Sequence, residues 1–304
     1  MIYIGKRLLQ AALVVFCVLT VVFFLIRLTG DPVMFMVPIG ATQEQIQQVR
    51  DEMGFDRPLP AQYFTFLNNA VKGDLGMSVR YEQPALEIVL ERLPATLHLT
   101  AVAFIFMVLF ALPLGILAAI KKNSILDLSS SGLALFGQSV PSFWLGIVLI
   151  LLFSVKWPLF PSSGYSRFSA LILPGITLGA FSASLVTRMT RSSLLEVLDT
   201  NYIVTARAKG LSELIVVLKH ALRNASIPIV TIIGLQIGPM LGGAIITEQV
   251  FGFPGMARLA VQAVLNRDFP IVQAFVVVVS AMIVLINLLV DVIYYFLDPR
   301  LKHE

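Results

Sequence analysis

Long apolar runs alternate with shorter polar segments along this chain, and six of the runs could cross a hydrocarbon core of about 30 Å as helices. We predict membrane-spanning helices at residues 8–28, 97–120, 130–155, 169–190, 227–249 and 272–296. Barrel strands would instead give alternating segments of about 10 residues, a pattern that the sequence lacks. The predicted fold class is therefore an all-α polytopic membrane protein with six transmembrane helices.

Composition agrees with this prediction. Hydrophobic residues make up 57% of the chain and charged residues only 13%, and the mean hydropathy is +0.87, far from the values of soluble domains. The single cysteine, Cys17, lies inside the first apolar run and supports neither a disulfide framework nor a metal cluster. The run itself, Leu8 to Ile26, is longer than the hydrophobic part of a signal peptide, about 7–15 residues, so we expect it to be a retained helix.

The distribution of charge predicts an orientation. With the N-terminus in the cytoplasm, the inner side carries twelve Lys and Arg residues against six acids, and the outer side carries ten against eleven. Because Lys and Arg near span ends favour the cytoplasm, both termini are predicted to lie inside. The pI of about 9.3 is explained by this asymmetry, and we expect no nucleic-acid partner.

Three parts follow from these spans. Residues 1–29 hold the first transmembrane helix, 30–95 form a small helical extracytoplasmic subdomain, and 96–304 form a core with five transmembrane helices. In the subdomain, Thr42 and Gln45 fit a capping box at a helix start. A second helix is expected from Pro60 to near Gly73, since proline favours the first helical turn.

The polar loop at 187–226 is the most informative segment, because it holds six of the 22 Lys and Arg residues between two apolar spans. It predicts two short helices separated at Gly210, with Asp199 or Thr200 capping the first and Ser212 the second. The second helix has an apolar face of Leu214, Val217, Leu218, Ala221 and Leu222. Such a helix could lie on anionic lipid. The small residues of the first helix favour docking in a protein groove instead.

Several motifs in this order resemble a known family. ARAKG (Ala206–Gly210) and LKHALRNASIP (Leu218–Pro228) resemble the cytoplasmic loop of binding-protein-dependent ABC importer permeases, specifically the dipeptide or oligopeptide permease B-type subunits of the peptide/nickel group. The similarity extends over nearly the whole chain, through TGDPV (Thr29–Val33), GFDRPLPAQY (Gly54–Tyr63), GDLGMS (Gly73–Ser78), RLPATL (Arg92–Leu97), RMTRSSLLEVL (Arg188–Leu198), EQVFGFPGMARL (Glu248–Leu259), NRDFP (Asn266–Pro270) and DPRLK (Asp298–Lys302). The general importer motif has Glu-Ala-Ala where this chain has Val204-Thr205-Ala206. This departure resembles the peptide/nickel subgroup.

The resemblance implies a function and a set of partners. The first loop helix would be the coupling element that sits in a groove of a cytoplasmic ATPase, through Asn201, Tyr202, Thr205, Ala206, Arg207, Ala208, Lys209, Gly210 and Leu211. The partners implied are a second homologous permease, two ATPase subunits and an extracytoplasmic solute-binding protein, together with membrane lipid. The chain has no phosphate-binding GxxxxGK[ST] motif, so ATP and Mg would be bound by the ATPase partners and no cofactor by this chain.

Alternatives from other classes are weaker. Asp291 in the sixth span and Glu248 at the outer end of the fifth are candidate substrate-path residues, because intramembrane acids are often functional. An ion-coupled secondary transporter would use such an acid as a relay, yet Asp291 has no companion acid or histidine in the other spans. Topology separates His98 from His220 and His303, so we expect no metal site, and no catalytic constellation supports an enzyme.

The sequence therefore predicts a transport subunit of the bacterial inner membrane that moves dipeptides or short oligopeptides by alternating access, driven by partner ATPases. Glutathione, nickel chelates, opines or another small solute remain alternative cargoes, since nothing in the spans identifies the cargo.

Overall fold

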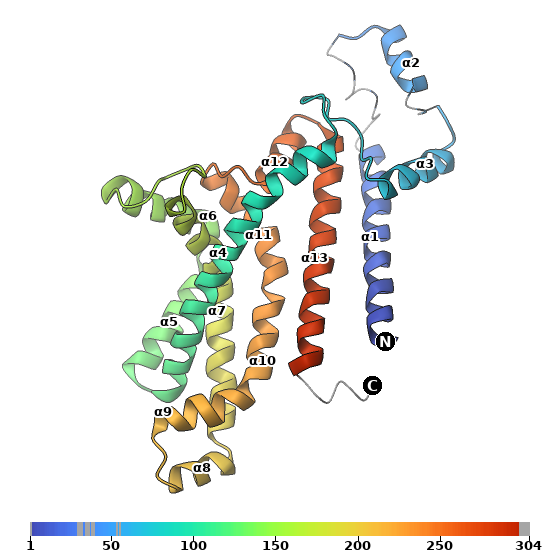
Figure 1. Cartoon of the computed structure of the whole chain (residues 1–304). Coiled ribbons are helices and arrows are strands. Elements are labelled where there is room, and N and C mark those ends of the chain that lie inside the picture. The colour runs from blue at the N-terminus through green and yellow to red at the C-terminus, as the bar shows by residue number, and fades with distance from the viewer. Residues whose placement is uncertain are drawn as a thin grey trace. The chain divides into compact units, whose positions relative to one another are not determined.

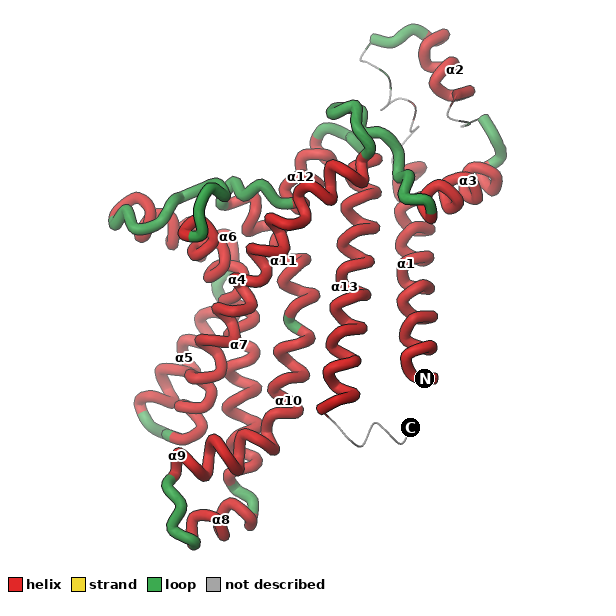
Figure 2. Tube along the Cα trace, viewed as in Figure 1, coloured by secondary structure: helices red, strands yellow, loops and turns green. Residues whose placement is uncertain are grey.

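A computed structural model describes residues 2–28, 33, 37, 40–52, 54 and 56–297, and its regular elements are helices (Figures 1 and 2). One isolated bridge, Met77 with Pro84, is the exception among the described residues. The N-terminal elements are α1 (Ile2–Leu28), α2 (Gln43–Glu52), α3 (Leu59–Val71), α4 (Ala85–Ile120) and α5 (Ile125–Ser139). These are followed by α6 (Ser142–Ile150), the π-helical η2 (Leu151–Lys156), α7 (Ser169–Leu198), α8 (Asn201–Ala208) and α9 (Glu213–Ile215). The last are the π-helical η3 (Val216–Ala221), α10 (Leu222–Leu235), α11 (Ile237–Val250), α12 (Met256–Leu265) and α13 (Phe269–Leu297).

Within the described chain, four helical segments are long and apolar enough to cross a membrane: 85–120, 169–198, 213–250 and 269–290. A fifth is possible if α5 and the helix at 142–156 together form one broken span. These two are bent by 106° at Pro141, which cannot donate the backbone hydrogen bond that a continuous helix needs. The predicted third span is therefore sharply broken. The all-helical membrane fold is confirmed, while the number six and the orientation stay predictions.

The chain forms two compact units. The first contains residues 1–96 and 254–285, and the second contains 97–253 and 286–304. The core of the first unit gathers Ala85, Val89, Met256, Ile271 and Ala274 with their neighbours. The buried Asp268 also joins the start of α13 to the loop between α3 and α4, because its Oδ2 accepts a 2.5 Å hydrogen bond from Ser78 Oγ. The predicted division at residues 29 and 95 stays a prediction.

Local predictions in the N-terminal region hold. The backbone N–H of Thr42 donates to Gln45 Oε1 (2.9 Å) and that of Gln45 to Thr42 Oγ1 (3.4 Å), which is the reciprocal capping box. Pro60 lies in the first turn of α3. The first N–H groups of a helix have no partner within the helix. The capping box supplies partners for them, and proline removes one of them.

The second unit is built around α7, which packs against α5, α6, α10 and α11. Glycines also let α7 approach α4 closely. A Cβ on Gly179 would lie 2.7 Å from the backbone oxygen of Ala103 in α4, and one on Gly115 would lie 2.8 Å from the backbone oxygen of Thr187. Because lipid tails are as apolar as leucine, helices in a membrane are held by such close contact rather than by the hydrophobic effect.

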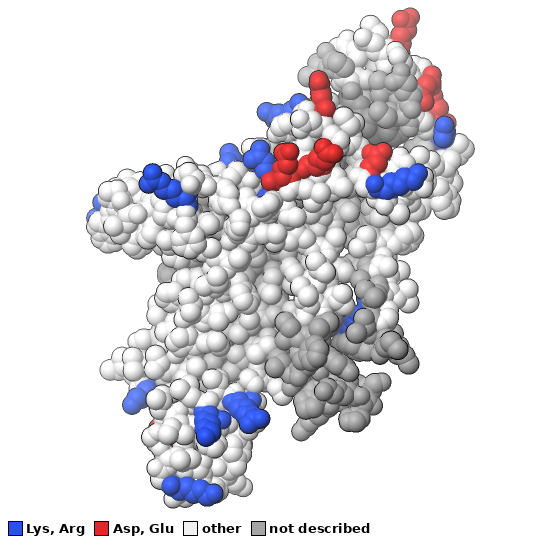
Figure 3. Space-filling view, in the orientation of Figure 1, with Lys and Arg blue, Asp and Glu red and all other residues white. Residues whose placement is uncertain are grey.

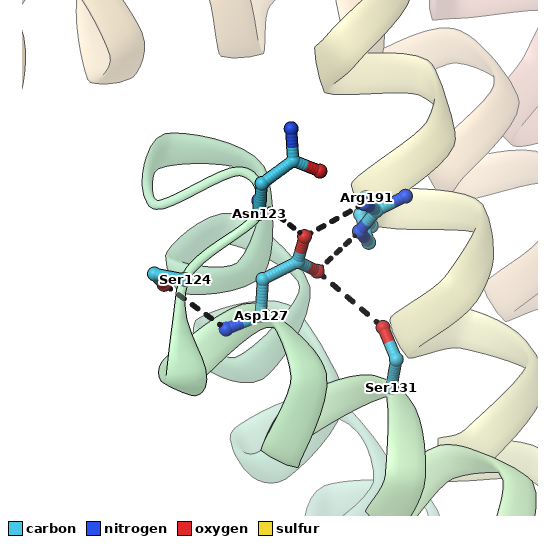
Figure 4. Close-up of polar contacts among 5 residues, drawn as sticks. All are labelled: Asn123, Ser124, Asp127, Ser131 and Arg191. Atoms are coloured by element: carbon cyan, nitrogen blue, oxygen red, sulfur yellow. Dashed lines mark hydrogen bonds and ion pairs between the residues drawn. The ribbon is translucent and has the colours of Figure 1, made fainter.

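An ion pair also joins α5 to α7 (Figure 4). Arg191 donates from Nε and Nη2 to the two carboxylate oxygens of Asp127, at 2.6 and 2.8 Å. The carboxylate also accepts from the backbone N–H of Asn123 (2.9 Å) and weakly from Ser131 Oγ (3.4 Å). The two-pronged geometry is the strong form of this interaction, and the Asp127 side chain is only 7% exposed. The pair therefore holds the start of α5 against the last third of α7.

The contact of α4 with α7 can be tested by adding one methyl group. We expect Gly179→Ala to destabilise the protein by about 1–3 kcal/mol through overpacking against Ala103. Gly132→Ala, in α5, is the matched control, because a Cβ there meets nothing within 4 Å and helix propensity should add roughly 0.5–1 kcal/mol of stability. Thermal unfolding in detergent measures both. A melting temperature for Gly179→Ala at or above wild type would contradict the close contact.

The ion pair can be tested by removing one or both charges. We expect Asp127→Leu to cost about 3–5 kcal/mol, because it leaves the Arg191 guanidinium partly buried without its carboxylate. Adding Arg191→Met should recover most of that loss. Ser131→Ala, which removes only the 3.4 Å contact, should have a small effect. If the double variant is as unstable as Asp127→Leu in the same unfolding assay, the charge is not the cause.

Candidate functional site

The polar loop forms a short hairpin that follows α7 and leads into α10 (Figure 1). Its first arm is α8 and its second arm consists of α9 and η3. Gly210 separates them with φ of +79°, the left-handed conformation that residues with a Cβ adopt at a cost. The two predicted helices and their glycine break are confirmed.

The predicted caps are correct in position but not in bonding. Thr200 and Ser212 are the N-cap residues, and neither side chain makes the cap hydrogen bond. Thr200 Oγ1 instead donates to the backbone oxygen of Val197 at 2.5 Å. The hydroxyl thus bonds to the end of α7, and it ties the hairpin to that helix more than it stabilises α8.

The inner side of the hairpin is an apolar core shared with three membrane helices. Ile203 and Ala206 of α8 lie with Val216, Val217 and Ala221 of η3 in this core. It is completed by Ala119 of α4, Leu194 and Leu198 of α7, and Ala225 and Ile229 of α10. Ala206 is only 7% exposed, so this residue supports α8 from behind and does not present its side chain to a partner.

The predicted apolar face of the second arm is partly wrong. Leu214 and Leu218 are exposed, whereas Val216 and Val217 are fully buried. The prediction assumed 3.6 residues per turn, but the helix widens to a π-turn over Val216–Ala221. A π-turn inserts one residue into the helical period, which shifts the buried face. Such turns are frequent at functional sites.

Polar contacts close the hairpin on its outer side. Arg207 donates from Nε and Nη2 to the two carboxylate oxygens of Glu213, at 3.1 and 2.6 Å. The hydrogen bond to Glu213 holds the pKa of Arg207 above its ordinary value. Asn224 Nδ2 donates to the Tyr202 hydroxyl at 2.7 Å, which joins α8 to the first turn of α10. The first contact therefore links the two arms across Gly210, and the second fixes α8 to the helix that follows the hairpin.

The remaining side of the hairpin is open. Most of the predicted coupling residues are exposed there, together with Val204, which the sequence prediction omitted. They are Asn201, Tyr202, Thr205, Arg207, Ala208, Lys209, Gly210 and Leu211. Lys and Arg side chains gather over the hairpin end of the second unit (Figure 3). The middle of the unit, where the long helices run, is uncharged on the face visible in Figure 3. The arrangement offers a compact, exposed helix that is followed by Lys209 and is packed on an apolar core.

A cavity of about 630 Å³ opens between α5, α7 and α10. It is lined by Ser131, Leu135, Leu185, Arg188, Met189, Arg191, Ser192 and Ile232. Arg188 also donates to Gln138 Oε1 at 2.8 Å. Since Asp127 neutralises Arg191, one uncompensated guanidinium and several apolar side chains line this space. Sequence reasoning missed both the cavity and the ion pair. Asp127, a lone acid in the first turn of an apolar helix, was a signal for the ion pair.

The two substrate-path candidates lie in different helices. Glu248 lies in α11 of the second unit, is fully buried and interacts with other groups of the chain. Asp291 lies in α13, and its side chain is outside the described part of the structure. Among the described residues, no group of three His, Cys, Asp or Glu side chains could hold a metal ion.

Comparisons with known proteins identify the family. Residues 111–303 match the model of the binding-protein-dependent transport system inner membrane component, and residues 1–100 match the model of the N-terminal part of such membrane components. The chain is 42% identical to the dipeptide transport system permease protein DppB of Escherichia coli K12, over 92% of each chain. It is also 42% identical to the glutathione transport system permease protein GsiC of the same strain, over 99% of each.

The fold is similar to that of solved importers. A chain of the inward-facing MetNI methionine ABC transporter superposes with a TM-score of 0.62 at 22% identity, covering 71% of this chain and 98% of that one. A chain of an amino acid ABC transporter solved with histidines gives 0.54 at 19% identity, covering 68% and 92%. The resemblance seen in the motifs is thus confirmed. This chain belongs to the inner-membrane permeases of binding-protein-dependent ABC importers, in the peptide and glutathione group, and is a multi-pass transport subunit rather than an enzyme.

Proposed function

We propose that this chain is one of two homologous membrane subunits of an importer for dipeptides or short oligopeptides, and that α8 is its coupling helix. The observation that carries the proposal is the two-sided construction of the hairpin. Its inner side packs against α4, α7 and α10 in one apolar core, and its outer side is exposed and basic.

This construction suits the transmission of force. A push on α8 acts on Ile203 and Ala206, which contact the core that also contains Leu194 of α7 and Ile229 of α10. Packed interiors are hard to compress, so the displacement would reach both membrane helices. The exposed Arg207–Glu213 pair links the two arms across Gly210, and alternating access would follow from the movement of α7 and α10.

The hairpin residues divide into two roles under this proposal. Ala206 would position α8, and Arg207 would serve mainly to close the hairpin on Glu213. The groove of an ATPase would be met by the remaining exposed residues, which are Asn201, Tyr202, Val204, Thr205, Ala208, Lys209, Gly210 and Leu211.

The assembly that we propose has six transmembrane helices in this subunit, with both termini and the 187–226 loop in the cytoplasm and the 30–95 segment outside. The partners would be a second permease, two ATPases that bind ATP and Mg, and an extracytoplasmic solute-binding protein. The positive-inside rule and the basic hairpin support the orientation. An ion-coupled transporter acting alone is the alternative, and it would work in proteoliposomes without an ATPase.

For the cargo, two relatives at equal identity carry a dipeptide and a glutathione name. Both cargoes are short peptides with free carboxylates, and this shared chemistry supports a short-peptide importer. We propose the dipeptide as the principal cargo. Glutathione, nickel chelates or opines would be recognised by the solute-binding protein without any change in the coupling mechanism.

The coupling role predicts an asymmetry between two exposed lysines of the hairpin. Lys209→Glu, at the end of α8, should reduce ATP-dependent uptake by an order of magnitude or more, because it places a negative charge in the ATPase contact. Lys219→Glu, in η3, is the matched control and should retain uptake, since it lies on the other arm. Gly210→Pro should abolish uptake with membrane insertion intact, because proline cannot adopt the positive φ of Gly210. Normal uptake by Lys209→Glu and Gly210→Pro would refute the assignment.

The cargo prediction is tested by uptake in cells whose other peptide importers have been deleted. We expect the complete transporter to take up a labelled dipeptide, and excess unlabelled dipeptide to compete more strongly than excess glutathione. A strain with Gly210→Pro is the control for background entry. Uptake of glutathione in preference to the dipeptide would reassign the cargo and leave the coupling proposal standing.

A further inference from the structure

We propose that α3 is a lipid-binding interfacial helix, which lies in the outer headgroup region of the bilayer and anchors the first unit there. Nothing in the transport function assigns a role to this helix. The proposal concerns the membrane alone and is independent of the cargo and of the coupling mechanism.

The first observation is that α3 divides lengthwise into three strips. Tyr63 and Phe66 contact the buried Phe23 of α1, and Ala70 packs on the core of the first unit. A second strip, Pro60, Phe64, Leu67 and Val71, spans about 60° of the helix at 3.6 residues per turn. In this strip Phe64 is 68% exposed and Val71 84%. The third strip is exposed and small or polar, with Ala61, Thr65 and Asn68.

The second observation is the depth at which α3 meets α1, and Figure 1 shows it lying across the end of that helix. The Tyr63 hydroxyl lies 2.6 Å from Thr20 Oγ1, and the rings of Tyr63 and Phe23 are 5.1 Å apart. At 1.5 Å per residue, Thr20 lies roughly 9 Å below Ile26, the last residue of the apolar run of α1. This depth matches the roughly 5–10 Å to which interfacial helices bury their apolar face.

The third observation is the placement of charge. Residues 59–71 carry no charged side chain, whereas Arg57 precedes the helix and Lys72 follows it. Basic residues at both ends can reach lipid phosphates while the uncharged helix lies between them. Tyr63 contributes the amphipathic ring that is typical of the interface. Exposure of Phe64 and Val71 to water would be unfavourable, and lipid removes this exposure without any further partner.

The test is depth-dependent fluorescence quenching in the full-length chain, purified with whatever subunits it retains. Trp144 and Trp157, the two natural tryptophans, are replaced by Phe, and a single tryptophan is introduced by Phe64→Trp. The matched control is Thr65→Trp, the neighbouring exposed position on the polar strip. Each protein is reconstituted into phosphatidylcholine vesicles whose acyl chains are brominated near the carbonyl end.

We expect the tryptophan at position 64 to be quenched several-fold more strongly than the one at 65, with blue-shifted emission. Val71→Trp, on the same strip, should behave like Phe64→Trp and replaces it if that variant does not insert. Blue-shifted emission without quenching at 64 and 71 would mean that a protein subunit covers the strip. Red-shifted emission without quenching would mean that it faces water. Either result, or equal quenching at 64 and 65, would overturn the proposal.

Discussion

The second unit depends on the close approach of α7 to its neighbours, because that approach is the main source of cohesion available between helices in lipid. Two glycines make it possible along one side. Gly175 lies against Val102 and Gly179 against the backbone of Ala103, both in α4. Further along, Gly115 of α4 admits Thr190 of α7. The same two helices therefore meet backbone to backbone over several turns, which leaves little freedom for one to slide along the other.

Under the coupling proposal, this rigidity determines how a displacement of the hairpin would be transmitted to the membrane helices. The last turns of α7 contribute Leu194 and Leu198 to the core beneath α8, so the hairpin extends a helix that is already locked to α4. By contrast, the second arm enters α10 through the π-turn of η3, where one residue is inserted into the helical period. One arm is thus rigidly attached and the other joins through an irregular turn. A displacement of α8 would move α7 as a lever, while the π-turn could absorb a change in the direction of α10.

Sequence reasoning succeeded where short-range chemistry decides the structure. The Thr42–Gln45 capping box and the helix break at Gly210 each depend on a few neighbouring residues, and both were predicted. It failed where a distant partner decides. Nothing near Asp127 in the sequence identifies Arg191 as its partner, and no local pattern announces the π-turn that buries Val216 in place of Leu218. The cavity at Arg188 was missed for the same reason, since three helices far apart in the chain form it.

The first unit is held together by different means, and this difference explains why α3 needs the bilayer. Where α1 meets α3, the contact consists mainly of aromatic rings, with Phe23 against Tyr63 and Phe66 and with Phe24 beside Tyr63. Large rings hold two helices together without close backbone contact, but they leave much of α1 uncovered, including Leu9, Leu13 and Val21. Hydrocarbon removes this apolar surface from water. A helix that crosses α1 at the edge of the hydrocarbon and shares its aromatic cluster would therefore set how deeply α1 lies in the bilayer.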